Sequence, residues 1–243
     1  MSRALLAICG AACAAILSAC QTPMATSVLR ERAELPATAA IEPAPAESAP
    51  AERAVSPKVE LQSPLQALPR PKLSERVAEL LVDHAPDLSP VDRARVASVI
   101  QSAQEAHQLD PLLVLAIIEQ ESQFDPKARG HGGSIGLMQV KPFVARDIAQ
   151  RHGIPWKGPK TLLDPAANVS IGACYLGEMF EMYGDPGLAI VAYNLGPYRV
   201  QRMVANGRNT QTQYLLSVLA RYQALSSQFG PVDPEEVEDA NAE

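Results

Sequence analysis

The sequence predicts one mainly α-helical domain behind an export signal and a linker. Three observations support this fold class: Asp-Pro or Ser-Pro pairs stand where apolar segments begin, glycines stand where they end, and no alternating strand pattern of useful length occurs. A proline in the first helical turn loses no hydrogen bond, and a preceding Asp or Ser caps free amides, so each pair predicts a helix start.

The predicted helices follow in chain order. Ser89-Pro90 opens a helix to about His107, with Asp92 at the acidic position of a capping box. Three further helices start at Asp110-Pro111, Asp164-Pro165 and Asp185-Pro186. Helix ends are predicted at Gly153, Gly184 and Gly207.

Residues 1–19 have the features of a lipoprotein signal peptide. One basic residue precedes an apolar run, Ala4 to Leu17, that is too short to span a bilayer and is followed by small residues. The last residues, Leu17-Ser18-Ala19-Cys20, resemble the box after which such signals are cut and the cysteine is acylated. Gln21 instead of Asp is typical of lipoproteins of the outer membrane. We expect an exported, lipid-anchored protein facing the periplasm; an ordinary signal peptide is the alternative.

The composition divides the rest of the chain into three parts. Residues 20–72 are rich in Ala, Pro, Ser and Glu and predict a disordered tether between Cys20 and the folded part. Residues 73–229 form the predicted domain, and residues 230–243 form an acidic, solvated tail. The chain has a formal net charge of −6, with nearly balanced charge in the domain, which argues against a nucleic-acid partner.

Cysteine and histidine usage predicts neither a disulfide nor a metal site. Once the signal is removed, the acylated Cys20 and Cys174 are the two cysteines that remain. The small, apolar neighbours of Cys174 predict that it is a buried core thiol. The four histidines show no HExxH pattern and no close Cys/His spacing, so we expect no metal and no cofactor.

Two glutamates, Glu119 and Glu121, lie near the end of the helix that starts at Pro111. Residues two apart on a helix point about 160° apart, so the two cannot flank one reacting bond. A carboxyl at the rim of a buried helix is partly desolvated and can stay protonated as a general acid. Periodicity does not choose between the two. The long irregular stretch 123–141, with a short extended piece at 136–140, is where function is expected.

Four ordered blocks settle the choice by resemblance. They are "ESQFDPKA" from Glu121, "GLMQV" from Gly136, "LLDPAANVSIGACYL" from Leu162 and "AYNLGP" from Ala192. Over roughly residues 107–222 this pattern resembles the catalytic domain of lytic transglycosylases, a goose-type lysozyme-like α+β fold with a minimal β element. The resemblance implies cleavage of the bond between N-acetylmuramic acid and N-acetylglucosamine in peptidoglycan glycan strands, leaving 1,6-anhydro ends.

The resemblance also assigns roles. Glu121 is the sole catalytic acid and base, Tyr193 hydrogen-bonds it, and Asn194 positions the sugar or the acid. Met138 and Gln139 line the saccharide groove. The implied substrate-binding residues together are Ser122, Met138, Gln139, Tyr193, Asn194 and Tyr214. Besides the glycan, the membrane is the one further partner expected, through the lipid on Cys20; protein partners are not specified.

Departures from the family pattern leave alternatives open. Gly130 stands where a serine that supports the acid is usual, and Leu195, Tyr198 and Thr210 also differ from the family. A non-catalytic glycan-binding lipoprotein and a hydrolytic muramidase on the same fold are therefore the alternatives. The run "HGGSIG" from His131 also fits a G-x-S-x-G nucleophile elbow, but the strand, helix and downstream acid and histidine that this motif needs are missing. Trp156 is either a sugar platform or a packing residue.

Overall fold

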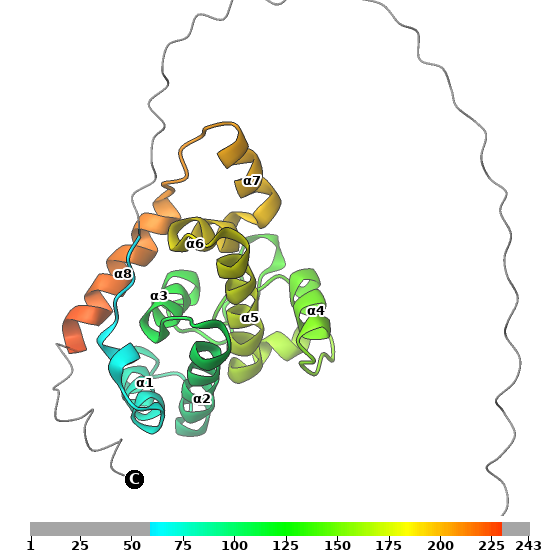
Figure 1. The fold of residues 1–243 in the computed structure, drawn as a ribbon. Coiled ribbons are helices and arrows are strands. Elements are labelled where there is room, and N and C mark those ends of the chain that lie inside the picture. The colour runs from blue at the N-terminus through cyan, green and yellow to red at the C-terminus, as the bar shows by residue number, and fades with distance from the viewer. Residues whose placement is uncertain (1–58, 230–243) are drawn as a thin grey trace, which may run out of the picture. The chain divides into compact units, whose positions relative to one another are not determined.

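A computed structural model describes residues 59–229 of the chain, and the signal peptide, Cys20, most of the predicted tether and the acidic tail lie outside these residues. Helices make up most of the described part, and none of them is long and apolar enough to cross a bilayer. The α-helices, shown in Figure 1, are α1 (Arg70–His84), α2 (Pro90–His107), α3 (Pro111–Ser122), α4 (Pro142–Arg151), α5 (Pro165–Tyr183), α6 (Pro186–Leu195), α7 (Pro197–Ala205) and α8 (Gln213–Phe229). Short 3-10 turns are η1 (Pro64–Ala67), η2 (His131–Gly133) and η3 (Pro159–Leu163).

The folded domain begins earlier than the sequence predicted. Ser63 caps η1 by accepting a hydrogen bond from the Leu65 amide, and α1 already starts at Arg70. Leu65 and Leu68 are buried in the core. The predicted start of the domain at residue 73 is therefore too late, because two leucines among Pro and Ala suffice to anchor this short segment.

The predicted helix starts and ends are confirmed. Each predicted cap residue accepts a hydrogen bond from an amide of the first turn: Ser89 from Asp92, Asp110 from Leu112, Asp164 from Ala167 and Asp185 from Leu188. Gly184 ends α5 in the left-handed region, at φ 63°. Gly153 and Gly207 follow the ends of α4 and α7 within two residues.

Helix α3 lies inside the bundle. All residues from Pro111 to Ile118 are buried, and α3 packs against α8, α2 and η1. In Figure 1, α3 lies between α8 and α5. Each large side chain buried in this way contributes about 1.5–3 kcal/mol of transfer free energy. The last turn of α3, which carries both glutamates, is therefore fixed by the packing of the turns before it.

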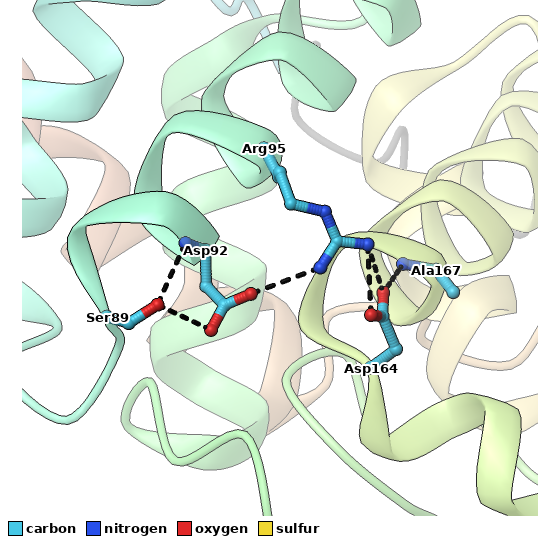
Figure 2. A network of polar contacts seen from close by, with 5 residues as sticks. All are labelled: Ser89, Asp92, Arg95, Asp164 and Ala167. Atoms are coloured by element: carbon cyan, nitrogen blue, oxygen red, sulfur yellow. Dashed lines mark hydrogen bonds and ion pairs between the residues drawn. The ribbon is translucent and has the colours of Figure 1, made fainter.

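A polar network joins the starts of α2 and α5 (Figure 2). The Arg95 guanidinium donates to Asp92 Oδ1 at 3.1 Å and to Asp164 Oδ1 at 3.0 Å. Asp92 belongs to the first turn of α2, and Asp164 caps α5 by accepting from the Ala167 amide at 2.8 Å. One arginine thus links the acidic groups at two helix N-termini by partly exposed ion pairs, in addition to the packing of α2 against α5.

Extended structure is minimal, as predicted. Among the described residues it consists of isolated antiparallel bridges that pair Ile135 with Arg129 and with Val140. The loop that contains them connects α3 to α4 and lies against the N-terminal half of α5 through the buried Asn168.

Candidate active site

The Glu121 side chain is half-buried in the last turn of α3. Its Oε1 accepts a hydrogen bond of 2.7 Å from the Tyr214 hydroxyl at the start of α8. Burial raises the pKa of the carboxyl, and the bond from Tyr214 opposes this rise. Within the described part of the chain no charged group contributes to the shift, so no second carboxylate acts on Glu121 there.

Tyr214 is a dependable donor to this carboxyl. Burial and the neighbouring charge of Glu121 raise the pKa of Tyr214 well above its usual value. The phenol therefore keeps its proton over the pH range in which Glu121 titrates. It stabilises the carboxylate more than the acid, because a donated hydrogen bond is stronger to the charged form.

Glu119 belongs to a different environment. Its carboxylate lies 3.6 Å from the Arg221 guanidinium of α8, and Arg221 Nε donates to Gln120 Oε1 at 3.1 Å. Both partners of the ion pair are about 30% exposed. The two glutamates thus have different partners, Arg221 for Glu119 and Tyr214 for Glu121, and both partners belong to α8.

The chain reverses sharply after Glu121. Gln123 and Phe124 both have positive φ, 51° and 63°, and the buried Phe124 side chain holds this turn against the core. Such φ values are uncommon outside glycine and cost energy, so the surrounding packing must enforce them. The Asp125 amide then donates to the Ser122 carbonyl oxygen at 3.0 Å, which closes the turn at the end of α3.

Gln139 holds this loop closed. Its Nε2 donates to the carbonyl oxygens of Ala128 at 3.2 Å and Gly136 at 2.8 Å, and its Oε1 accepts from Ser134 Oγ at 2.8 Å. All hydrogen-bonding atoms of the amide therefore have partners inside the loop. The structure gives Gln139 an internal role in addition to the groove-lining role that the resemblance implied.

Gly130 is explained by the same contacts. A Cβ atom at this position would lie 2.3 Å from Gln139 Oε1 and 2.5 Å from Ser134 Oγ, far inside contact distance. The backbone at Gly130 has φ −104°, which any residue adopts. Glycine is therefore required here by the lack of room for a Cβ atom and not by the backbone conformation. The serine expected here would displace the pair that closes the loop.

Two predicted side-chain roles are wrong. The Met138 side chain is fully buried against Gly172 of α5, so it cannot line an open groove. Tyr193 does not hydrogen-bond Glu121, because its hydroxyl donates to the Met138 carbonyl oxygen at 2.7 Å. A single hydroxyl proton serves one acceptor, and the donor to the acid is Tyr214. Tyr193 instead holds the loop at Met138.

Asn168 is a residue that the motif analysis missed. It is completely buried in the first turns of α5 and makes three hydrogen bonds to the loop region: its Oδ1 accepts from the Met138 amide at 2.8 Å, and its Nδ2 donates to the carbonyls of Ile135 and Leu162. The signal in the sequence was an amide among apolar residues on a core helix, where a buried polar group needs partners.

The two remaining predicted residues, Ser122 and Asn194, have no hydrogen bond to the Glu121 carboxyl in the described part of the chain. Ser122 donates to the Ile118 carbonyl within α3, and Asn194 is exposed at the end of α6. Tyr175 is a further aromatic neighbour: its ring centroid lies 5.3 Å from that of Tyr193, and burial raises its pKa to about 12. The charge of Glu121 acts on both Tyr193 and Tyr214, and Tyr175 lies beside Tyr193.

The serine-nucleophile alternative is excluded by geometry. Ser134 is 8% exposed, and its hydroxyl proton is donated to the amide oxygen of Gln139, which is no base. Trp156 packs against the hydrophobic core, in agreement with the packing role.

Sequence comparisons show which proteins this chain is similar to. Residues 98–216 match the family model described as "Transglycosylase SLT domain". The soluble lytic murein transglycosylase of Escherichia coli K12 is 33% identical over 132 residues, which are 54% of this chain and 20% of that protein. Its counterpart from Salmonella typhimurium is 38% identical over 94 residues, 38% of this chain and 15% of that protein. The membrane-bound lytic murein transglycosylase C of Histophilus somni is 34% identical over 126 residues, 47% of this chain and 34% of that protein. The chain thus spans 15% to 34% of these relatives.

Comparison with solved structures supports the fold. A 70-kDa soluble lytic transglycosylase in complex with bulgecin A superposes with a TM-score of 0.52 at 22% identity, covering 69% of this chain and 32% of the other. The predicted fold class, mainly α and lysozyme-like with a minimal β element, is confirmed.

Proposed function

We propose, from the match of residues 98–216 to the transglycosylase domain family, that this protein is a peptidoglycan lytic transglycosylase. The observation that carries the proposal is Glu121, a desolvated carboxyl whose pKa is raised and which is held by Tyr214, with no second acid of the described residues acting on it. A site with one protonated carboxyl suits a glycosidase that needs no carboxylate nucleophile.

In the proposed first step, Glu121 gives its proton to the glycosidic oxygen between N-acetylmuramic acid and N-acetylglucosamine. The bond from that oxygen to C1 breaks while the acetamido oxygen of the muramic acid attacks C1. This is the substrate-assisted variant of glycoside cleavage. The raised pKa favours this step, because it keeps a larger fraction of Glu121 protonated near neutral pH.

In the second step, the Glu121 carboxylate takes the proton of the 6-hydroxyl of the same sugar. The 6-oxygen attacks C1, the bond from C1 to the acetamido oxygen breaks, and a 1,6-anhydro ring closes without water. Tyr214 would stabilise the carboxylate between the steps. The loop fixed by Gln139, Asn168 and Tyr193 would form the floor beside the acid and position it, without itself touching the reacting atoms.

Mass spectrometry of purified sacculi digested with the full chain tests the proposal. Anhydro-muropeptides are the expected products. Reducing ends would identify a hydrolytic muramidase instead, and the absence of products from folded protein would leave a non-catalytic glycan-binding lipoprotein. The substrate class, the catalytic role of Glu121 and the anhydro product all depend on this result.

We further propose that Cys20 carries the lipid that holds the protein at the outer membrane. The support is the lipoprotein box at 17–20 and Gln21, and the H. somni relative is named membrane-bound. Replacing Cys20 by alanine should move the protein from the membrane fraction to the soluble periplasmic fraction. Retention in the outer membrane after Cys20→Ala would contradict the anchor.

A further inference from the structure

A second cluster of reactive side chains lies where the ends of α2 and α4 meet the middle of α5. It consists of His107, His152 and Cys174, whose possible ligand atoms all lie within 4.8 Å of one another. His107 is the last residue of α2, and His152 directly follows α4. The rings of the two histidines meet edge to face, with centroids 5.8 Å apart.

The His107 ring lacks the partner that its burial requires. Its Nδ1 is buried and makes no hydrogen bond; Glu181 Oε1 lies 3.8 Å away. Gly177 permits this position, since a Cβ there would lie 2.8 Å from Nδ1. A buried ring nitrogen without a partner is costly unless something binds it. The unpartnered Nδ1 of His107 therefore indicates that a ligand binds beside this ring.

We propose that His107, His152 and Cys174 bind a Zn²⁺-like transition-metal dication. Imidazole nitrogens and thiolates are ligands that Zn²⁺ and related transition-metal dications bind in proteins. Tetrahedral bonds of about 2.0–2.3 Å set ligand atoms about 3.3–3.8 Å apart, so side-chain rotation has to close the cluster by about 1 Å. Binding replaces the thiol proton of Cys174, which passes to solvent, by the metal–sulfur bond.

The surroundings favour a cation. Two helices end here, and the C-terminal end of a helix carries partial negative charge. Glu178 contacts His152 Nε2 at 3.0 Å and is also bound by Arg151 through bonds of 2.9 and 2.8 Å, so its charge is already compensated. Glu181 is the exposed acid left to complete the coordination. The metal would connect α2, α4 and α5 on the outer side of the domain.

The spacing of Cys and His predicted no metal site, because the three residues are far apart in the chain, and the small, apolar neighbours of Cys174 predicted a core thiol. In the structure Cys174 packs against the core but is only partly buried. The fold brings the three side chains together from three helices, as no local motif could indicate.

Co²⁺ titration of the full chain, after removal of metal with a chelator, tests the proposal. We expect one Co²⁺ per chain, tetrahedral visible bands and a thiolate charge-transfer band. Cys174→Ser should abolish the charge-transfer band, and His152→Asn, a change at the exposed edge, should weaken binding at least about tenfold. His84→Asn is the matched control, because His84 lies on α1 outside the cluster, and it should bind as the unchanged chain does.

The second measurement is the rate at which the Cys174 thiol is alkylated. Zn²⁺ should slow alkylation of Cys174, measured by peptide mapping, in the unchanged chain and in His84→Asn but not in His152→Asn. Circular dichroism verifies the fold of each variant, and His152→Asn decides the question where Cys174→Ser does not fold. Equal Co²⁺ binding by the unchanged chain and His152→Asn, or no saturable binding by the unchanged chain, would overturn the site.

Discussion

The hydroxyl of Tyr214 donates a 2.7 Å hydrogen bond to the carboxyl of Glu121, across 93 positions of sequence. This bond joins the end of the buried helix α3 to the start of α8. Among residues 59–229 it is the one interaction that opposes the effect of burial on the pKa of Glu121. It therefore sets how strongly the proposed acid holds its proton.

Removing this bond should shift the pH dependence of activity. In Tyr214→Phe the carboxylate loses its donor, so the pKa of Glu121 rises further. Activity that needs the protonated acid is lost as pH rises through this pKa, so the basic limb should move to higher pH. The second step loses a bond to a charged group, worth about 1.5–3 kcal/mol, and kcat should fall roughly ten- to hundredfold.

The control for this variant is Tyr193→Phe. Its hydroxyl donates to the Met138 carbonyl and not to the acid, so the basic limb should stay in place even where the protein loses stability. pH–rate profiles of muropeptide release by both variants measure the effect. Equal movement of the limb in both variants would contradict the role of Tyr214.

The two glutamates should differ in activity. Glu121→Gln removes the only proposed acid and should abolish release of anhydro-muropeptides. Glu119→Gln removes a partly exposed ion pair with Arg221 and should leave most of the release of anhydro-muropeptides intact. Release from sacculi by equal amounts of the two folded variants measures the difference. Loss of activity in Glu119→Gln with activity kept in Glu121→Gln would reverse the assignment.

Glu121→Gln should also stabilise the fold in a pH-dependent way. Because burial raises the folded-state pKa of Glu121 above its unfolded value, ionisation destabilises the folded protein. Below the unfolded pKa the carboxyl is protonated in both states, so the variant and the unchanged chain should be alike. As pH rises through the folded pKa, the unchanged chain should lose stability relative to the variant. Melting temperatures at acid and neutral pH measure this gap, and a gap that closes with rising pH would show that Glu121 is not desolvated.

Gly130→Ser should destabilise the loop although serine resembles the family pattern. The new Cβ would collide with Gln139 Oε1 and Ser134 Oγ, and the loss of their hydrogen bond should cost about 1–3 kcal/mol. Urea denaturation measures the change. The same substitution in a Gln139→Ala background, where the space is free, should cost clearly less. An equal cost in both backgrounds would place the cause elsewhere.

The helix starts and ends were predictable because caps, prolines and glycines act locally, within one turn. The choice of Glu121 over Glu119 needed the ordered motifs, because both lie on the same short helix end. The partner of Glu121 could not be predicted, since Tyr193 and Tyr214 are both tyrosines and only the packing of α6 and α8 decides which hydroxyl meets the carboxyl. The burial of Met138 depends likewise on the absence of a side chain at Gly172, which lies far away in the sequence, on α5.

Asn168 gives the sharpest test of how the loop beside the acid is held. Asn168→Ala leaves the Met138 amide and the carbonyls of Ile135 and Leu162 without partners in a fully buried place. Each unsatisfied group costs about 1–3 kcal/mol, so the variant should lose about 3 kcal/mol or more of unfolding free energy. Asn194→Ala, at an exposed position, should stay within about 0.5 kcal/mol of the unchanged chain. Because Asn168 holds the backbone of Met138, and Tyr193 holds the same residue from α6, the folded fraction of Asn168→Ala should also release muropeptides more slowly. Urea denaturation and release assays on both variants measure these effects, and equal stability of the two would mean that the three hydrogen bonds do not hold the loop.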